Sequence, residues 1–191
     1  MKMIRFVSII AIFCFFQLEA SGQVPTAKLD SIKQVLSSTQ SDSLRARLYM
    51  LLSGGTRFSN AQASLSYSDS ALALAEKLNS KRYYAAILSL KGATLLEVGK
   101  IPESLAAQFE SLEISQVVKD TGNTAIVLNR IGNTYMELGD FPKAIEYYRL
   151  SRNLFASLGS TVEFNELSNI GNVYELMDVR DSAMYYQKLT L

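Results

Sequence analysis

The chain of 191 residues contains no histidine and no tryptophan, and it has only one cysteine and three prolines. The absence of histidine excludes the common zinc sites and the histidine-based catalytic triads. The single cysteine, Cys14, lies in an apolar N-terminal run, so the rest of the chain offers no disulfide and no thiolate nucleophile. We therefore expect no catalytic residues, no metal site and no cofactor in this segment.

The N-terminal residues 1–22 have the pattern of a signal peptide. Lys2 and Arg5 precede an uncharged run at residues 6–16, which is shorter than the about 20 residues that a membrane-spanning helix needs. We expect cleavage before Gln23 and export to the periplasm or the extracellular space. After cleavage, this segment is expected to make no membrane contact.

Charge is balanced in the remainder of the chain. Without Lys2, Arg5 and Glu19, 17 basic and 17 acidic residues are left. This balance lacks the basic excess of a nucleic-acid-binding protein, so no nucleic-acid partner is expected. The apolar content of 48% is sufficient for a sizeable core.

A repeat is the most informative feature that the sequence does contain. Gly92, Gly132 and Gly171 are spaced 40 and 39 residues apart and have matching neighbours. The matching residues are Leu88, Leu128 and Leu167 upstream, and Leu95, Tyr135, Tyr174, Ser104, Ala144 and Ala183 downstream. Self-similarity at this period indicates a stacked array in which each unit buries its apolar face against its neighbours.

The apolar spacing between Ala125 and Leu158 predicts two helices. Between them, Gly139 can end the first helix, Asp140 can cap the second, and Pro142 suits a first turn. Gly159 breaks the second helix, and a further helix is expected from about Thr161 to Met177.

The repeated glycines fall in the middle of helices, where glycine costs roughly 1 kcal/mol relative to alanine. Close contact with a neighbouring helix is the usual compensation. We therefore predict that Gly92, Gly132 and Gly171 each face the small residue that follows in the same unit, which is Ser104, Ala144 or Ala183.

The repeat divides the chain after the signal peptide into a leading segment and an array. Residues 23–42 are expected to form a short helix and a linker, and residues 43–191 the array. Its units are about 43–80, 81–120, 121–160 and 161–191, the last one incomplete. The first unit is degenerate, because Leu52 stands where the others have glycine. We expect the native reading frame to continue past Leu191.

Residues 128–135 (LNRIGNTY) and 139–148 (GDFPKAIEYY) resemble the tetratricopeptide repeat (TPR), and residues 167–174 (LSNIGNVY) repeat the first part. The resemblance implies an all-α, right-handed solenoid of helical hairpins that binds a protein or peptide in its concave groove. The period of 40 exceeds the common 34 and is similar to that of long-helix TPR proteins.

The order of signal peptide, leading helix and degenerate first unit is similar to the sensor half of bacterial TPR-containing histidine kinases. In that family, a transmembrane helix and an output domain follow the repeats. The alternatives are therefore a free-standing exported scaffold and the truncated sensor region of a membrane-bound signalling protein. An enzyme of unknown type is a third alternative, which the absence of histidine disfavours.

Four asparagines of the first helices are the candidate ligand-binding residues: Asn129, Asn133, Asn169 and Asn172. Asn129 and Asn133 are four residues apart and share a helix face. An amide both donates and accepts hydrogen bonds, which suits recognition of an extended peptide backbone. Arg130 can hold a ligand carboxylate through a forked contact. The alternatives are solvent-facing asparagines and a surface ion pair for Arg130.

Overall fold

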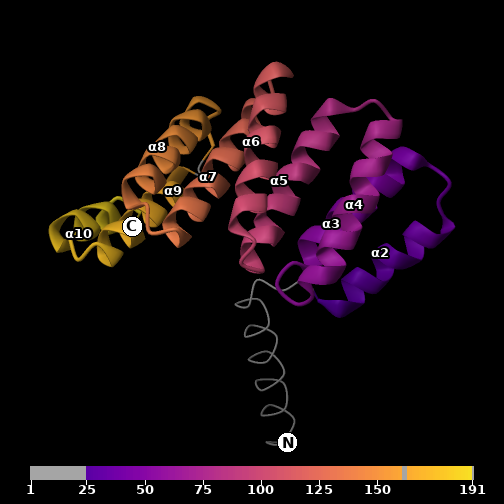
Figure 1. The fold of residues 1–191 in the computed structure, drawn as a ribbon, viewed down its shortest axis with the longest axis horizontal. Helices are drawn as coiled ribbons and strands as arrows, with labels where there is room; N and C mark the ends of the chain where they lie inside the picture. The colour runs from indigo at the N-terminus through magenta and orange to yellow at the C-terminus, as the bar shows by residue number, and fades with distance from the viewer. Residues whose placement is uncertain (1–24, 161–162, 191) are drawn as a thin grey trace, which may run out of the picture.

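The computed structural model describes residues 25–160 and 163–190. Within these ranges the chain forms nine α-helices and no strand (Figure 1). The helices follow one another along the long axis, with α2 at one end and α10 at the other. The predicted all-helical solenoid is therefore confirmed. The predicted signal peptide, residues 1–22, lies outside the described residues.

The helices are regularly spaced along the chain. The helices α4 to α8 each have 17 residues, and the first residues of successive helices in this series are 20 residues apart. One hairpin therefore accounts for the 40-residue period. The helices are α2 (Thr26–Ser38), α3 (Asp42–Thr56), α4 (Ala61–Lys77), α5 (Lys81–Glu97), α6 (Ile101–Val117), α7 (Thr121–Glu137), α8 (Phe141–Ser157), α9 (Glu163–Leu176) and α10 (Arg180–Lys188).

The turns that follow α4 to α9 each contain one residue in the left-handed conformation, which ends the preceding helix. After α7 this residue is Gly139, with φ of 74°, and the next residue, Asp140, donates its N–H to the carbonyl of Tyr135. The Asp140 side chain then accepts from the N–H of Lys143 and caps α8, as predicted. The left-handed residues are Asn79, Gly99, Lys119, Gly139, Gly159 and Asp178.

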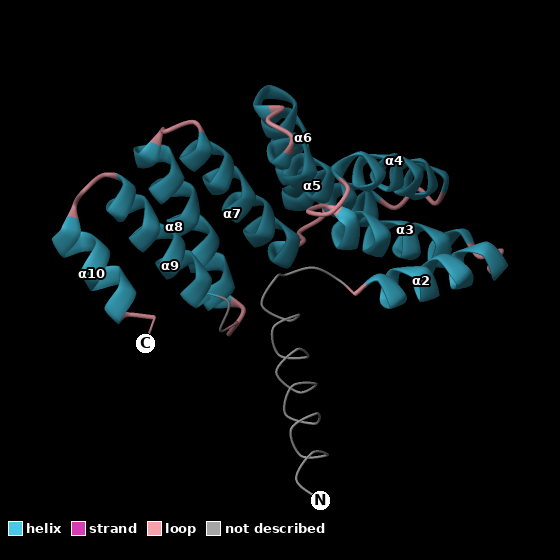
Figure 2. Ribbon diagram, turned by 90° about the horizontal axis from the view of Figure 1, so that it is seen from below, coloured by secondary structure: helices cyan, strands magenta, loops and turns pink. Residues whose placement is uncertain are grey.

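Consecutive helices pack as hairpins, and the first helices of neighbouring hairpins contact one another. The hairpins are α3–α4, α5–α6, α7–α8 and α9–α10, and α5 contacts both α3 and α7. Figure 2 shows the same succession of helices from a second direction. The side chains that these contacts bury fully include Ile87, Val127, Ile131 and Tyr148. The first helices therefore form a continuous face of the array.

Two of the three repeated glycines lie at close helix contacts. A Cβ atom at Gly132 would lie 2.7 Å from Cε1 of Tyr148, so the ring of Tyr148 takes the place predicted for Ala144. A Cβ atom at Gly92 would lie 2.8 Å from Cγ of Gln108 and 3.2 Å from the carbonyl oxygen of Ser104.

Gly171 differs from the other two. The atom nearest to a Cβ added at Gly171 would be Cβ of Tyr186, at the ordinary contact distance of 3.5 Å. The predicted close approach is therefore confirmed at Gly92 and Gly132 and is absent at Gly171.

The leading helix α2 packs against α3 at one end of the array. Leu29 is its buried residue, whereas Val35 on the same helix is 45% exposed. Only a narrow strip of α2 therefore takes part in the packing.

Candidate functional site: a polar cavity on the first helices

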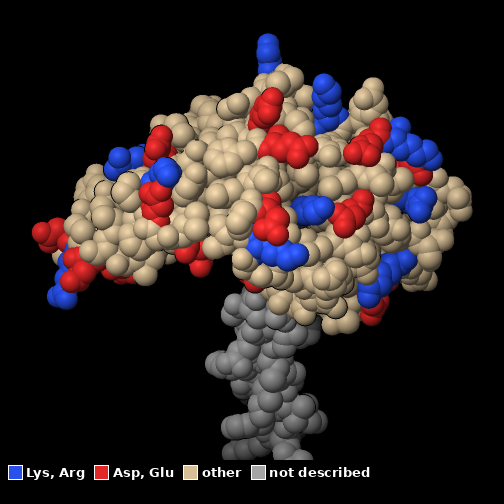
Figure 3. Space-filling model, viewed as in Figure 1, with Lys and Arg blue, Asp and Glu red and all other residues tan. Residues whose placement is uncertain are grey.

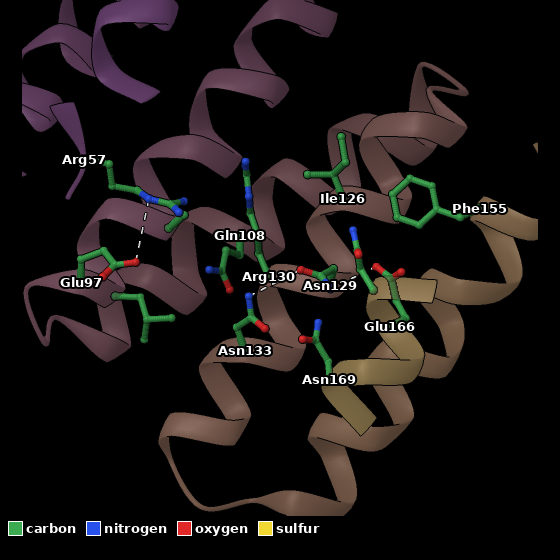
Figure 4. Close-up of a pocket in the computed structure, with 13 residues that line it drawn as sticks. Arg57, Glu97, Gln108, Ile126, Asn129, Arg130, Asn133, Phe155, Glu166 and Asn169 are labelled. Atoms are coloured by element: carbon green, nitrogen blue, oxygen red, sulfur yellow. Dashed lines mark hydrogen bonds and ion pairs between the residues drawn. The ribbon is translucent and has the colours of Figure 1, made fainter. Parts of the chain in front are cut away.

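A cavity of about 340 Å³ opens on the face formed by the first helices (Figure 4). Its walls come mainly from α5, α7 and α9 and from Arg57, which directly follows α3, with Gln108 of α6 and Phe155 of α8 completing the lining. The lining is rich in polar groups. Five lining residues carry amides, namely Gln108, Asn129, Asn133, Asn165 and Asn169, and four carry charges, namely Arg57, Glu97, Arg130 and Glu166.

The structure brings together four of the five residues that the sequence singled out. Asn129, Arg130 and Asn133 line the cavity from α7, and Asn169 lines it from α9. Asn172 is exposed and does not line this cavity. The residue on α9 that extends the amides of α7 is therefore Asn169.

A chain of hydrogen bonds fixes the orientation of the two α7 amides. The Tyr148 hydroxyl donates to Oδ1 of Asn133 at 2.7 Å. Nδ2 of Asn133 lies 3.5 Å from Oδ1 of Asn129, and Nδ2 of Asn129 donates to Oε1 of Glu166 at 3.1 Å. The acceptor oxygens of Asn129 and Asn133 are therefore already engaged, and each amide retains one N–H that these bonds do not use.

The amide of Asn169 differs from those of Asn129 and Asn133 in its hydrogen bonding. Its side chain is half-buried, lines the cavity and forms no hydrogen bond with the described residues. Both its donor and its acceptor are therefore available to a ligand.

Arg130 places a cation on the wall of the cavity. Nη1 of Arg130 donates to Oγ of Ser89 at 2.5 Å, and no carboxylate of the described residues lies within ion-pair distance. Burial, together with the nearby positive charge of Arg57, lowers the pKa of Arg130 to about 10. Arg130 therefore remains charged at neutral pH, and the predicted alternative of a surface ion pair is not observed among the described residues.

Arg57 is a second cation of the same wall, which the sequence argument missed. It forms a long ion pair with Glu97, with Nε 3.8 Å from Oε1. Burial lowers the pKa of Arg57, and the charge of Glu97 opposes that shift. Positions 57, 97 and 137 share one repeat offset, so this pair joins equivalent places of two successive hairpins.

Glu166 is the most buried charged residue of the cavity and was also missed. It is 1% exposed, and its Oε1 accepts from Asn129 and from Oγ of Ser151, both at 3.1 Å. Burial raises the pKa of this carboxyl group, although its hydrogen bonds oppose the shift. The sequence does mark this position as unusual, because the equivalent residues of the two preceding units, Ile87 and Val127, are aliphatic.

The face of the molecule that Figure 3 shows has a mixed charge distribution. Figure 3 shows acidic and basic side chains interspersed over one face without an extended patch of one sign. Over the residues that the structure describes, no group of three or more acidic, histidine or cysteine side chains could hold a metal ion. None of the helices in those ranges is long and apolar enough to cross a membrane.

Comparison with known proteins identifies the repeat. Residues 83–157 match the family model of the tetratricopeptide repeat. The fold is a TPR-type solenoid. No curated protein sequence matches the chain significantly. The predicted similarity to histidine kinase sensor regions finds no support in these comparisons and stays a prediction.

Solved structures with the same fold come from varied proteins. A Rap protein complexed with competence and sporulation factor is 16% identical, with a TM-score of 0.79 over 85% of this chain and 47% of that chain. A signal-transduction ATPase with a TPR sensor from Pyrococcus horikoshii is 18% identical, with a TM-score of 0.67 over 83% of this chain and 25% of the other.

A kinesin light chain with TPR-like repeats from Podosopora anserina is 12% identical, with a TM-score of 0.63 over 97% and 93% of the two chains. The chain spans about half the length of the Rap structures that it matches, at 47% and 46%. At these identities, the similarity concerns the fold alone.

Proposed function

We propose that this chain is an exported, non-enzymatic binding module that holds an extended peptide or protein segment across α5, α7 and α9. The observation that carries the proposal is the polar cavity on the first helices. Within the described part of the chain, the amide of Asn169 in this cavity has no hydrogen bond and the charge of Arg130 has no ion pair. Export is proposed from the signal-peptide pattern of residues 1–22.

The amides supply contacts that do not depend on the ligand's sequence. An extended peptide presents an N–H and a carbonyl at every residue, and a carboxamide can pair with both. Asn169 offers a complete amide, whereas Asn129 and Asn133 each offer one remaining N–H. The α7 side chains are held in place by Tyr148 and Glu166, so little conformational entropy is lost when they bind a ligand.

Arg130 adds a charged contact. A guanidinium has five donors in a planar fork, and Ser89 takes only one of them. A carboxylate of the ligand would pair with the remaining donors and offset the two neighbouring positive charges of Arg57 and Arg130. We therefore propose that the ligand carries an acidic group at this end of the cavity.

The sensor region of a larger signalling protein is the second candidate. The TPR sensor of the Pyrococcus horikoshii signal-transduction ATPase has the same fold and favours this alternative. Both candidates need the same peptide-binding surface, so the same experiment tests that surface for either one.

The test is selection of binders from a display library of random peptides on the purified protein. Affinities of the enriched peptides are then measured by calorimetry. Asn169→Ala should weaken binding about tenfold, because a hydrogen-bonded amide contributes about 0.5–1.5 kcal/mol. Thermal stability should not change, because the Asn169 side chain has no hydrogen bond to lose within the described residues.

Asn172→Ala is the matched control, because Asn172 lies on the same helix, is exposed and is not part of the cavity. Full affinity is expected for this variant. Equal binding by wild type and Asn169→Ala, or no enrichment of any peptide over an empty surface, would refute the proposed groove.

A further inference from the structure

One residue of the array breaks the repeat pattern at its core. The offset occupied by Ile87 and Val127, both fully buried, is occupied by Glu166 in the next unit. Glu166 is itself only 1% exposed. A carboxylate in an aliphatic position is costly, because burial removes it from water.

The contacts of Glu166 satisfy only half of its carboxylate. Oε1 accepts hydrogen bonds from Asn129 and Ser151, whereas Oε2 is buried and has no hydrogen-bond partner among the described residues. No lysine or arginine of the described residues lies within ion-pair distance of either oxygen. A buried acceptor without a partner destabilises the fold, and more strongly so when it is charged.

The unsatisfied carboxylate belongs to the wall of the polar cavity. In Figure 4, Glu166 projects from α9 toward Asn129, on the side of the cavity away from Arg57. The last torsion of a glutamate side chain is broad, so rotation about it can turn a carboxylate oxygen toward a ligand in the cavity. The cavity therefore has Arg130 and the Arg57–Glu97 ion pair on one side and the carboxylate of Glu166 on the other.

We propose that Glu166 binds a basic side chain of the ligand, the ammonium of a lysine or the guanidinium of an arginine. The proposal rests on the proposed function, because it assigns one contact of the same peptide. A cation supplies both the missing hydrogen bond to the carboxylate and the missing opposite charge. Together with Arg130, Glu166 selects a peptide with an acidic group at one end of the contact and a basic group at the other.

The cost of Glu166 to the fold supports a role in binding. The repeat itself indicates the stable alternative, because Val127 fills the equivalent position with a fully buried aliphatic side chain. Functional sites often contain residues that are less stabilising than the alternatives that would fit. A buried carboxylate in a position that an aliphatic side chain could fill is such a residue.

The experiment uses pools of short random peptides with blocked ends, in which one position is fixed. The fixed residue is lysine, arginine, glutamate or norleucine, which has the length of lysine without its charge. The purified full chain should bind the lysine and arginine pools about tenfold more tightly than the norleucine pool. Glu166→Gln, which keeps the shape and the Oε1 acceptor, should bind all pools with the weak affinity of norleucine.

Two further variants separate a binding role from a structural one. Glu166→Val should also lose the preference for basic pools, and its thermal midpoint should equal or exceed that of the wild type. Glu137→Gln removes an exposed carboxylate that does not line the cavity, and should keep the preference.

The outcomes distinguish this inference from the proposed function. If the wild type binds every pool equally, or if Glu166→Gln and Glu166→Val keep the preference for basic pools, Glu166 is not the cation site, although the groove still binds peptides. If no pool binds to the wild type, the groove itself is refuted and the assignment of Glu166 falls with it.

Discussion

The hairpins α7–α8 and α9–α10 carry the same glycine in the same sequence context, yet they use it differently. At Gly132 the ring of Tyr148 occupies the space that a Cβ would need, at 2.7 Å. At Gly171 the nearest atom would be 3.5 Å away, and a methyl group fits. The difference lies in the opposing helix, because the residue at the offset of Tyr148 is Gln187 in α10.

This comparison shows that a repeated glycine has no packing role by itself. Gly132 accepts a fully buried aromatic ring, whose hydroxyl then reaches Asn133 in the cavity wall. Gly92 is intermediate, because it faces the thinner side chain of Gln108. The contact at Gly132 therefore links the core of the hairpin to the candidate site, and the contact at Gly171 does not.

The largest effect is expected for Gly132→Ala. The new Cβ would overlap the ring of Tyr148, which is fully buried and cannot move away freely. Overpacking of this kind costs about 1–3 kcal/mol, which exceeds the gain of about 1 kcal/mol in helix propensity. Urea denaturation measures the loss. A midpoint equal to that of the wild type would contradict the close contact at Tyr148.

Gly92→Ala should destabilise the fold less. Its Cβ would approach Cγ of Gln108 at 2.8 Å and the backbone oxygen of Ser104 at 3.2 Å. Gln108 is flexible, but it is fully buried and its Nε2 donates to Ser104 Oγ, so it can shift only partly. We expect a loss of about 1 kcal/mol in the same measurement. A larger loss than for Gly132→Ala would reverse the proposed order.

Tyr148→Phe tests the link between the hairpin core and the site. The variant keeps the ring against Gly132 and removes the hydroxyl that donates to Asn133. The expected loss of stability is about 0.5–1.5 kcal/mol. Affinity for a selected peptide should also fall, because Asn133 is then free to rotate. Unchanged stability and affinity would show that the hydroxyl does not orient Asn133.

Gly171→Ala should have the smallest effect, with the opposite sign. No atom blocks the added methyl group, so the gain in helix propensity is retained in full or in part. We expect a stabilisation of up to about 1 kcal/mol. Destabilisation would indicate that α9 and α10 approach one another as closely as α7 and α8 do.

Sequence reasoning was most successful where chemistry is local. Gly139, Asp140 and Pro142 determine a helix end and a helix start through their own backbone preferences, and the structure has both. Periodicity was equally informative, because each unit packs only on its neighbours. The helices predicted around Ala125 to Met177 therefore end within a few residues of the observed bounds.

The candidate site was predicted only in part, because the lining of a cavity depends on how each hairpin is oriented relative to the next. Asn129, Arg130, Asn133 and Asn169 meet in it. Asn172 has the same repeat offset as Asn133, but this equivalence does not determine which α9 residue faces the cavity. Arg57 comes from a hairpin three units away from that of Asn169. Glu166 was visible as a break in the aliphatic pattern, but its hydrogen bonds and burial required the structure.

The equal spacing of the helix starts from α4 to α8 has a consequence for the history of the chain. Because each hairpin begins in the same phase, loss or duplication of one 40-residue segment would join two turns that already match. The length of such a protein can therefore change by recombination between units, without repair of the junction. A binding face built from successive first helices would then lengthen or shorten in whole steps of one hairpin.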